Sequence, residues 1–173
     1  MNEAANQAQP ERNRALPDAL GAEKVWKLMQ EIEICMLASL ENGVIRGRPM
    51  HARPRESENA VYFLTAARGD KDDEIAADDS VSLMFAEGGK FLAVTGRARV
   101  LNDRPMIREL WTDADGLWWK NAEDPDIRVI ELTPIDAQYW EGPHGVIGGA
   151  GAILTAMSGG MPSLGEQRKV PLS

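Results

Sequence analysis

The stretch ICMLASLENGVIRGRPM, residues 34–50, indicates the fold most directly. An apolar run from Ile34 to Leu40 leads into Glu41-Asn42-Gly43, and a second run continues from Val44 to Met50. Asn-Gly between two such runs is the strongest short-range signal for a β-hairpin, because both residues tolerate positive φ. This stretch therefore predicts two antiparallel strands joined by a tight turn.

Further strands are predicted along the rest of the chain, at residues 60–65, 80–87, 91–101 and 127–132. Gly88-Gly89 separates the second and third of these runs, which predicts another hairpin. The last run alternates Ile127, Val129 and Glu131 with the residues between them, as a strand does.

Helices are predicted between the strands. Asp18 can cap a helix whose apolar positions recur at helical spacing as far as Ile32, and residues 70–77 read as a short helix. Asp103 followed by Pro105 opens another helix that extends through Trp111. Antiparallel hairpins with helices between them indicate a mainly β fold with peripheral helices, a small barrel or an α+β domain, rather than a parallel sheet.

Length and composition limit the function classes. A chain of 173 residues is long enough for one domain with its own core. The formal charge of -8 argues against the broad basic surface that binds nucleic acid or anionic membranes, so an anionic ligand needs a local cationic site. The single cysteine, Cys35, cannot form an intrachain disulfide, and no secretion signal or membrane-spanning run is present. We expect a cytoplasmic protein with no nucleic-acid or membrane partner.

The domain organisation follows from the changes in pattern. Residues 1–17 carry no hydrophobic period and are expected to form a disordered arm, followed by one domain over residues 18–142. Residues 143–173 are rich in glycine, and we expect this tail to dock on the domain or on a partner subunit. A phosphate-binding glycine loop is less consistent with the tail, because such a loop needs a preceding strand and a lysine in register.

No residue pattern announces a specific catalytic chemistry. The two histidines, His51 and His144, are far apart, and the acidic residues do not cluster with them, so no metal site is predicted. No nucleophile-elbow pattern is visible. His51 has a better claim to a functional role than His144, because it lies beside the candidate site described next.

The order and spacing of several motifs resemble those of a known family. The motifs are Arg46-Gly47-Arg48-Pro49-Met50, Val61-Tyr62-Phe63-Leu64-Thr65, Lys71, Val81-Ser82-Leu83-Met84-Phe85 and Val94-Thr95-Gly96-Arg97-Ala98. Together they resemble the flavin-binding framework of the pyridoxamine 5'-phosphate oxidase superfamily. Glu109-Leu110-Trp111, Trp118-Trp119, Asp124-Pro125-Asp126 and Tyr139-Trp140 look like its general stress protein branch. The resemblance extends from about Lys24 to Leu172.

The resemblance implies a split-barrel homodimer that holds FMN at the subunit interface. Arg48, Pro49 and Met50 would run along the flavin ring, Leu64 and Thr65 would line its ribityl-phosphate side, and Lys71 would contact the phosphate. One of the two tryptophans would approach the site from the other subunit. The cofactor-binding residues implied in this way are Arg48, Pro49, Met50, Phe63, Leu64, Thr65, Lys71, Trp118 and Trp119.

The chain departs from the family pattern just before Lys71. Gly69 and Asp70 stand where family members often place a hydroxyl group and a second cation. An acid at ~4 Å from a phosphate costs a few kcal/mol in a partly screened site, unless Asp70 turns away or Arg68 compensates. Structural roles also remain open: Arg48 as an exposed strand residue, Lys71 as the partner of a nearby acid, and the tryptophans as core or interface anchors.

The resemblance and the residues together favour an FMN-dependent oxidoreductase that acts on a small molecule or a reduced nicotinamide, in a stress-related role. In such a protein the cofactor supplies the chemistry and the chain supplies positioning. Two alternatives stay open. One is a non-catalytic protein that binds or stores flavin, and the other is the same barrel with another cofactor, a deazaflavin or haem. The residues with which the true oxidase binds its pyridoxamine phosphate substrate have no clear equivalent in this sequence.

Overall fold

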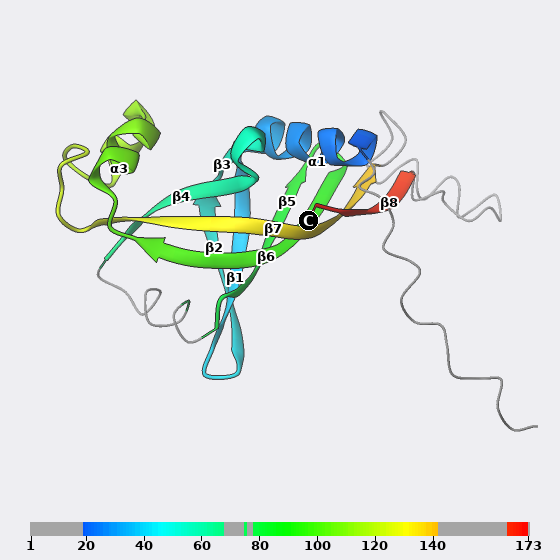
Figure 1. Cartoon of the computed structure of the whole chain (residues 1–173), viewed down its shortest axis with the longest axis horizontal. Helices are drawn as coiled ribbons and strands as arrows, with labels where there is room; N and C mark the ends of the chain where they lie inside the picture. Colours follow the sequence, from blue (N-terminus) through cyan, green and yellow to red (C-terminus); the bar gives the residue numbers. More distant parts are fainter. Residues whose placement is uncertain (1–18, 68–74, 76–77, 142–165, 173) are drawn as a thin grey trace, which may run out of the picture.

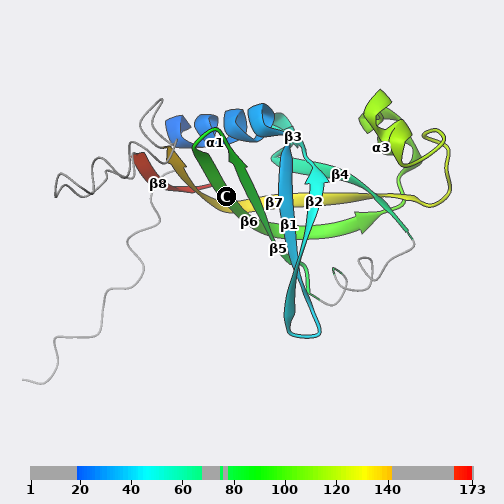
Figure 2. The same ribbon diagram turned by 180° about the vertical axis from the view of Figure 1, so that it is seen from behind.

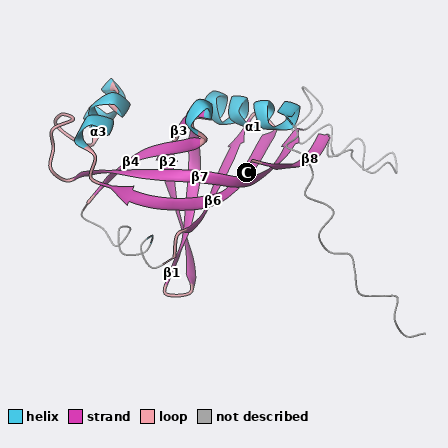
Figure 3. Cartoon of the chain, in the orientation of Figure 1, coloured by secondary structure: helices cyan, strands magenta, loops and turns pink. Residues whose placement is uncertain are grey.

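The computed structural model describes residues 19–67, 75, 78–141 and 166–172, and most of this part of the chain is β-structure (Figure 1, Figure 3). The helical elements are α1 (Ala19–Ile32), α3 (Arg104–Leu110) and the short 3-10 turns η1 (Glu56–Glu58) and η2 (Asp113–Leu117). The strands are β1 (Ile34–Glu41), β2 (Val44–His51), β3 (Arg53–Arg55), β4 (Ala60–Ala66), β5 (Ser80–Glu87), β6 (Lys90–Leu101), β7 (Ile127–Glu141) and β8 (Glu166–Pro171).

Both predicted hairpins are confirmed. β1 and β2 pair antiparallel up to Glu41 opposite Val44, and Asn42 and Gly43 turn the chain with φ of 49° and 78°. β5 and β6 are joined in the same way, because Gly88 and Gly89 have φ of 56° and 84°. Positive φ at both central residues gives a turn whose twist matches that of the flanking strands.

The strands form one antiparallel sheet in the order β2-β1-β5-β6-β7-β4-β3, with β8 added beside β7. The two strands at the ends of this order, β2 and β3, are separated in the chain by Ala52 alone. The edges of the sheet therefore meet, and the sheet curls into a barrel in which β6 and β7 cross the direction of β1 and β2 (Figures 1 and 2). This confirms the predicted mainly β, antiparallel barrel with peripheral helices.

β7 is longer than predicted, and the prediction that it ends at Leu132 is wrong. Pro134 cannot donate a hydrogen bond to a ladder, and a proline is therefore unusual inside a central strand. The structure instead accommodates it at a bulge: Gly96 pairs with Pro134 and Thr95 with Asp136, which leaves Ile135 as the extra residue. β3 and β8 were also not predicted as strands. Asp18, the remainder of the predicted 70–77 helix around Ile75, the arm and most of the glycine-rich tail lie outside the described residues.

Two buried clusters lie on opposite sides of β4. α1 buries an apolar face against the barrel interior, where Phe63 is fully buried. The neighbouring Leu64 points the other way, into a smaller cluster with Ile107 and Leu110 of α3. Successive side chains of a strand alternate between its faces, so this one strand separates the main core from the smaller cluster beside which the site lies.

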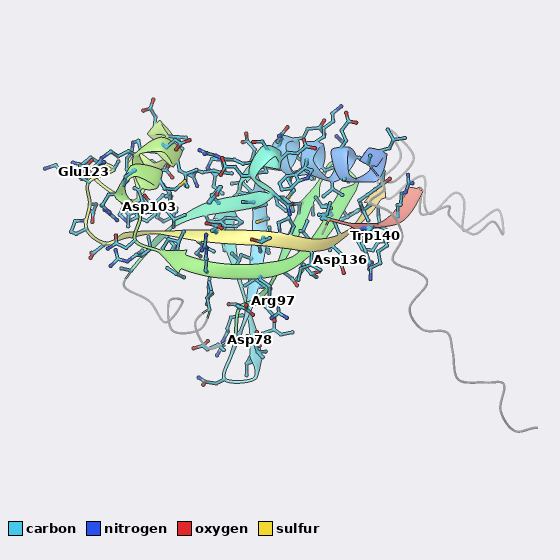
Figure 4. The ribbon with its side chains drawn as sticks, viewed as in Figure 1. Asp78, Arg97, Asp103, Glu123, Asp136 and Trp140 are labelled. Atoms are coloured by element: carbon cyan, nitrogen blue, oxygen red, sulfur yellow. The ribbon has the colours of Figure 1, made fainter. Side chains whose placement is uncertain are left out.

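α3 begins as predicted. Asp103 lies at the start of α3 (Figure 4). Its side chain accepts a hydrogen bond from the main-chain N–H of Met106 (3.0 Å), and Pro105 occupies the first turn. The helix ends at Leu110, one residue before the predicted Trp111. No helix in the described ranges is long and apolar enough to cross a membrane.

Candidate functional site

A cavity of about 460 Å³ opens where the ends of β2 and β4 meet the loop that follows α3. The described residues that line it are Ile34, Pro49, Met50, His51, Arg53, Leu64, Thr65, Ala66, Asp115, Trp118 and Trp119. Most of this lining is apolar or aromatic, and only a few polar groups enter it. That composition is typical of sites that hold a flat organic ligand and fix its orientation with a few polar contacts.

Strand pairing positions one wall of this cavity. Met50 lies opposite Cys35 and His51 opposite Ile34 at the open end of the first hairpin. Pro49 is exposed at this edge, and Met50 is half-buried. The end of β2, the last strand in the sheet order, thus contributes three consecutive residues to the lining of the cavity.

The end of β4 forms a second wall. Leu64 and Thr65 are buried, and Thr65 lies opposite Arg128 of β7. Thr65 is one of the few buried polar side chains among the described residues. It therefore adds one polar residue to the end of a largely apolar strand.

A buried ion pair joins the strand β3 to the loop after α3. Arg53 Nη2 donates to Asp115 Oδ1 at 2.6 Å, and the two side chains are only 11% and 8% exposed. The other guanidinium nitrogens are also engaged: Nε donates to the main-chain carbonyl of Leu110 (3.0 Å) and Nη1 to that of His51 (3.2 Å). Arg53 thus connects three separate segments around the cavity.

Asp115 is held by Thr112 as well. Its Oδ2 accepts hydrogen bonds from the main-chain N–H and the hydroxyl group of Thr112, both at 2.8 Å. The first of these bonds, together with the Asp115 N–H that donates to the Thr112 side chain, forms a capping box at the start of η2. Burial by itself raises the pKa of the Asp115 carboxyl. The Thr112 N–H, the Arg53 guanidinium and the Thr112 hydroxyl outweigh it, so the net pKa is lowered and the carboxylate form is favoured.

The main chain of the two tryptophans that follow η2 is held by hydrogen bonds to this turn. The N–H groups of Trp118 and Trp119 donate to the carbonyl oxygen of Asp115 at 3.0 and 3.1 Å. Trp119 packs against the smaller cluster, whereas the side chain of Trp118 is 79% exposed. An indole with so little packing depends on its main-chain anchor for its position at the cavity mouth.

The structure brings together Pro49, Met50, Leu64, Thr65, Trp118 and Trp119 around this one cavity. Arg48 does not line it, and its Nη1 donates to Ser39 Oγ at 3.1 Å on the neighbouring strand. Phe63 does not line it either, because strand alternation turns its side chain into the main core. Lys71 lies outside the described residues. Both tryptophans border the cavity of their own chain, whereas one was expected to serve a partner's.

Sequence reasoning did not select Ile34, Arg53, Ala66 or Asp115. The Thr112-x-x-Asp115 spacing is a recognisable capping signal, so the local turn was accessible from the sequence. The pairing of Asp115 with Arg53 could not be predicted from the sequence, because it joins residues 62 positions apart. His51, which the sequence did single out, lines the cavity, and no described residue hydrogen-bonds its imidazole.

Two other kinds of chemistry find little support in the described residues. Cys35 is buried, and desolvation raises its pKa to about 12, so the unreactive thiol form is favoured at neutral pH. Within residues 19–67, 75, 78–141 and 166–172, no group of three or more metal-ligating side chains occurs.

Comparison with known proteins adds a family to this geometry. Residues 21–161 match the profile of the family described as pyridoxamine 5'-phosphate oxidase like. The chain is 22% identical over 135 residues to the protein bli-3 of Neurospora crassa, an alignment that covers 71% of this chain. The same alignment covers 65% of bli-3, so this chain spans less than two thirds of the length of that relative.

Solved structures show the same fold. A protein assigned as general stress protein 26 from Jannaschia sp. CCS1 superposes with a TM-score of 0.68 at 22% identity, over 88% of this chain and 99% of the other. The general stress FMN/FAD binding protein of Xanthomonas citri superposes with a TM-score of 0.62 at 23% identity, over 73% of this chain and 92% of the other.

Proposed function

This chain belongs to the pyridoxamine 5'-phosphate oxidase-like family, and on that premise we propose that it is a cytoplasmic FMN-binding flavoprotein that acts as an oxidoreductase in a stress response. The observation that carries the proposal is the cavity shared by Pro49, Met50, Leu64, Thr65, Trp118 and Trp119. The Xanthomonas citri relative, whose name describes FMN/FAD binding, supports the choice of cofactor.

The residues of the cavity fit a flavin ring. An isoalloxazine has two apolar faces and a polar edge. Met50, Leu64 and the indoles can cover the faces, while the main chain at the end of β2 can meet the polar edge. The volume of about 460 Å³ lies within the range of small-molecule sites. The ribityl chain would extend along Thr65 toward residues 68–74, which carry Lys71.

Binding of the FMN phosphate would depend on Lys71, because the other cations near the cavity have partners of their own. The other cation implied by the resemblance, Arg48, donates to Ser39 on β1 and does not line the cavity. Arg53, the cation that does line the cavity, is neutralised by Asp115. We therefore assign the phosphate contact to Lys71 alone among the predicted cations, while the ring region stays close to neutral.

Bound FMN supplies one-electron and hydride transfer, and the chain supplies binding and exclusion of water. The apolar walls keep water from the ring, and the Arg53–Asp115 pair presents no net charge to it. His51 also lines the cavity, and its imidazole nitrogens can hydrogen-bond a small-molecule substrate there.

A homodimer with the site at its interface fits an exposed apolar surface beside the cavity. Met36 on β1 lies opposite Pro49 on one side and opposite Met84 on the other. Directly paired residues share one face of a sheet, and this face also carries the exposed side chains of Ile34 and Leu40. A second copy of the chain that covered this face would also close the cavity mouth next to Trp118.

A second candidate function is flavin binding or storage without turnover. It is favoured by the engagement of Arg53 and Asp115 with each other, because neither of these charged lining groups is then available to take part in turnover. Flavin that binds but is not reduced by reduced nicotinamides would support storage. Rapid bleaching of the bound flavin by a reduced nicotinamide would support the oxidoreductase.

The test of the proposal is a titration of FMN with the purified protein, followed by visible absorbance and flavin fluorescence. We expect shifted absorbance bands and quenched fluorescence that saturate at one FMN per chain. Unchanged spectra at high protein concentration would refute the proposal. The matched control is Leu64→Arg, which places a charged side chain in the apolar wall and is expected to abolish the spectral change.

A further inference from the structure

We propose that Arg53 is a positioning residue of the flavin site: its guanidinium ties the tryptophan-bearing loop to the strand wall and so sets the width of the cavity. This inference rests on the proposed flavin function, and it concerns a buried residue pair that lines the cavity. It is carried by the partners of the guanidinium: two of them, His51 and Asp115, line the cavity, and the third, Leu110, ends the helix that precedes the tryptophan-bearing loop.

Each partner of Arg53 belongs to a different segment. The Leu110 carbonyl ends α3, where the last carbonyl groups of a helix lack partners within the helix. The His51 carbonyl ends β2, which forms the strand wall. The Asp115 carboxylate belongs to η2, which leads into Trp118 and Trp119. A planar guanidinium with donors in a fixed fork can hold all three in one geometry, and a lysine ammonium cannot.

The connection to the tryptophans runs through Asp115. Its carboxylate is fixed by Arg53 on one oxygen and by Thr112 on the other, and its carbonyl oxygen accepts from the N–H groups of Trp118 and Trp119. Loss of Arg53 would leave a buried carboxylate without its counter-ion, which favours movement of η2 toward solvent. Since Trp118 is 79% exposed, little side-chain packing would hold its indole in place after such a movement.

Arg55 provides a matched comparison on the same strand. It also forms ion pairs, at 3.0 Å with Glu58 and 2.7 Å with Glu109, but it does not line the cavity and does not contact η2. A loss of flavin affinity that occurs when Arg53 is replaced, but not when Arg55 is replaced, is therefore caused by the contacts of Arg53 with the loop. It is not caused by the general loss of an arginine from β3.

The experiment compares the affinities of Arg53→Met, Arg53→Lys and Arg55→Met for both FMN and riboflavin, measured by flavin fluorescence. We expect Arg53→Met to lower the affinity for FMN and for riboflavin by the same factor, about tenfold. The factor is the same because the hydrogen bonds of Arg53 hold the wall of the cavity around the ring and do not contact the phosphate. Arg53→Lys should restore little of the affinity, and Arg55→Met should bind as the wild type does. Equal affinity in Arg53→Met and Arg55→Met would overturn the inference.

A double-mutant cycle separates positioning from direct contact. If Arg53 acts through the indole, Arg53→Met should add little to the loss caused by Trp118→Ala, whereas full additivity would indicate that Arg53 touches the flavin itself and would overturn the positioning role. Should Arg53→Met fail to fold, Asp115→Asn, which retains the shape of the side chain, should weaken both flavins equally, and unchanged affinity would overturn the inference. A wild-type chain that binds neither flavin would instead refute the proposed function.

Discussion

A Cβ atom added to Gly96 would lie 2.4 Å from the main-chain carbonyl oxygen of Thr133 and 2.9 Å from Leu132 Cδ2. The two strands approach this closely at the bulge where Gly96 pairs with Pro134. The bulge allows β7 to continue past its proline, and only a residue without a side chain fits opposite it.

Gly96→Ala is therefore expected to lower the free energy of unfolding by about 2 kcal/mol, because the strands must separate to accept the methyl group. Urea denaturation of the two proteins measures this difference. Gly116→Ala is the control, since nothing lies within 4 Å of the added Cβ there. A loss in Gly96→Ala no larger than that in the control would contradict the account of the bulge.

Asp115→Asn tests the buried ion pair through its pH dependence. The pKa of Asp115 is lowered in the folded chain, so its carboxylate contributes stability above its ordinary pKa, and this contribution disappears as the pH falls through the lowered value. At neutral pH we expect Asp115→Asn to cost about 3 kcal/mol of unfolding free energy. The difference from wild type should shrink below about pH 4.

The measurement is urea denaturation of both proteins at a series of pH values. The exposed Asp113, two residues earlier in the same turn, provides the control variant Asp113→Asn. A difference between Asp115→Asn and wild type that stays constant down to low pH would show that the carboxylate charge is not what Asp115 contributes.

Cys35 is expected to be unreactive in the folded chain. Burial raises its pKa to about 12, so the reactive thiolate form is scarce near pH 8. The side chain is also only 2% exposed, so an alkylating reagent cannot reach the sulfur. Alkylation followed by mass spectrometry should show no modification in buffer and complete modification in denaturant. Rapid labelling of the native protein would mean that β1 opens far more readily than its packing indicates.

Lys71→Ala tests the phosphate contact. If Lys71 holds the phosphate, the affinity for FMN should fall at least about tenfold, whereas the affinity for riboflavin, which lacks the phosphate, should change little. Fluorescence titration of both flavins with the two proteins measures this. Equal losses for FMN and riboflavin would assign Lys71 a role in the fold or at the ring.

Met36→Glu tests the proposed dimer face. A carboxylate placed between Pro49 and Met84 would have to be buried without a partner in the interface, so we expect the variant to be monomeric where the wild type is dimeric. Light scattering after gel filtration gives the two masses. The control is Leu20→Glu on α1, an apolar residue that is 76% exposed and does not lie on β1 or on the strands beside it. Equal masses for wild type and Met36→Glu would contradict the assignment.

The parts of the fold that were predictable are those encoded by short-range signals. Asn42-Gly43, Gly88-Gly89 and the Asp103 cap act within a few residues, and each element begins or turns where its signal lies. Pro134 is the opposite case. β7 continues through this proline because the bulge opposite Gly96, a residue of another strand, accommodates it, and no local signal indicates that pairing.

The site divides in the same way. Pro49, Met50, Leu64 and Thr65 lie on strands whose order could be compared with a family pattern, and they line one cavity. Phe63 illustrates what that comparison omits, because the two-residue period of β4 turns it away from its neighbour Leu64. The Arg53–Asp115 pair joins distant segments and carries no sequence signal of its own.

The central claim, that the cavity between β2, β4 and η2 is a flavin site, is tested most directly by a crystal structure of the protein grown with FMN. We predict density for the isoalloxazine ring between Met50 and the two tryptophans, with the ribityl chain passing Thr65. A ring bound elsewhere on the chain, or a saturated complex with this cavity occupied only by water, would contradict it.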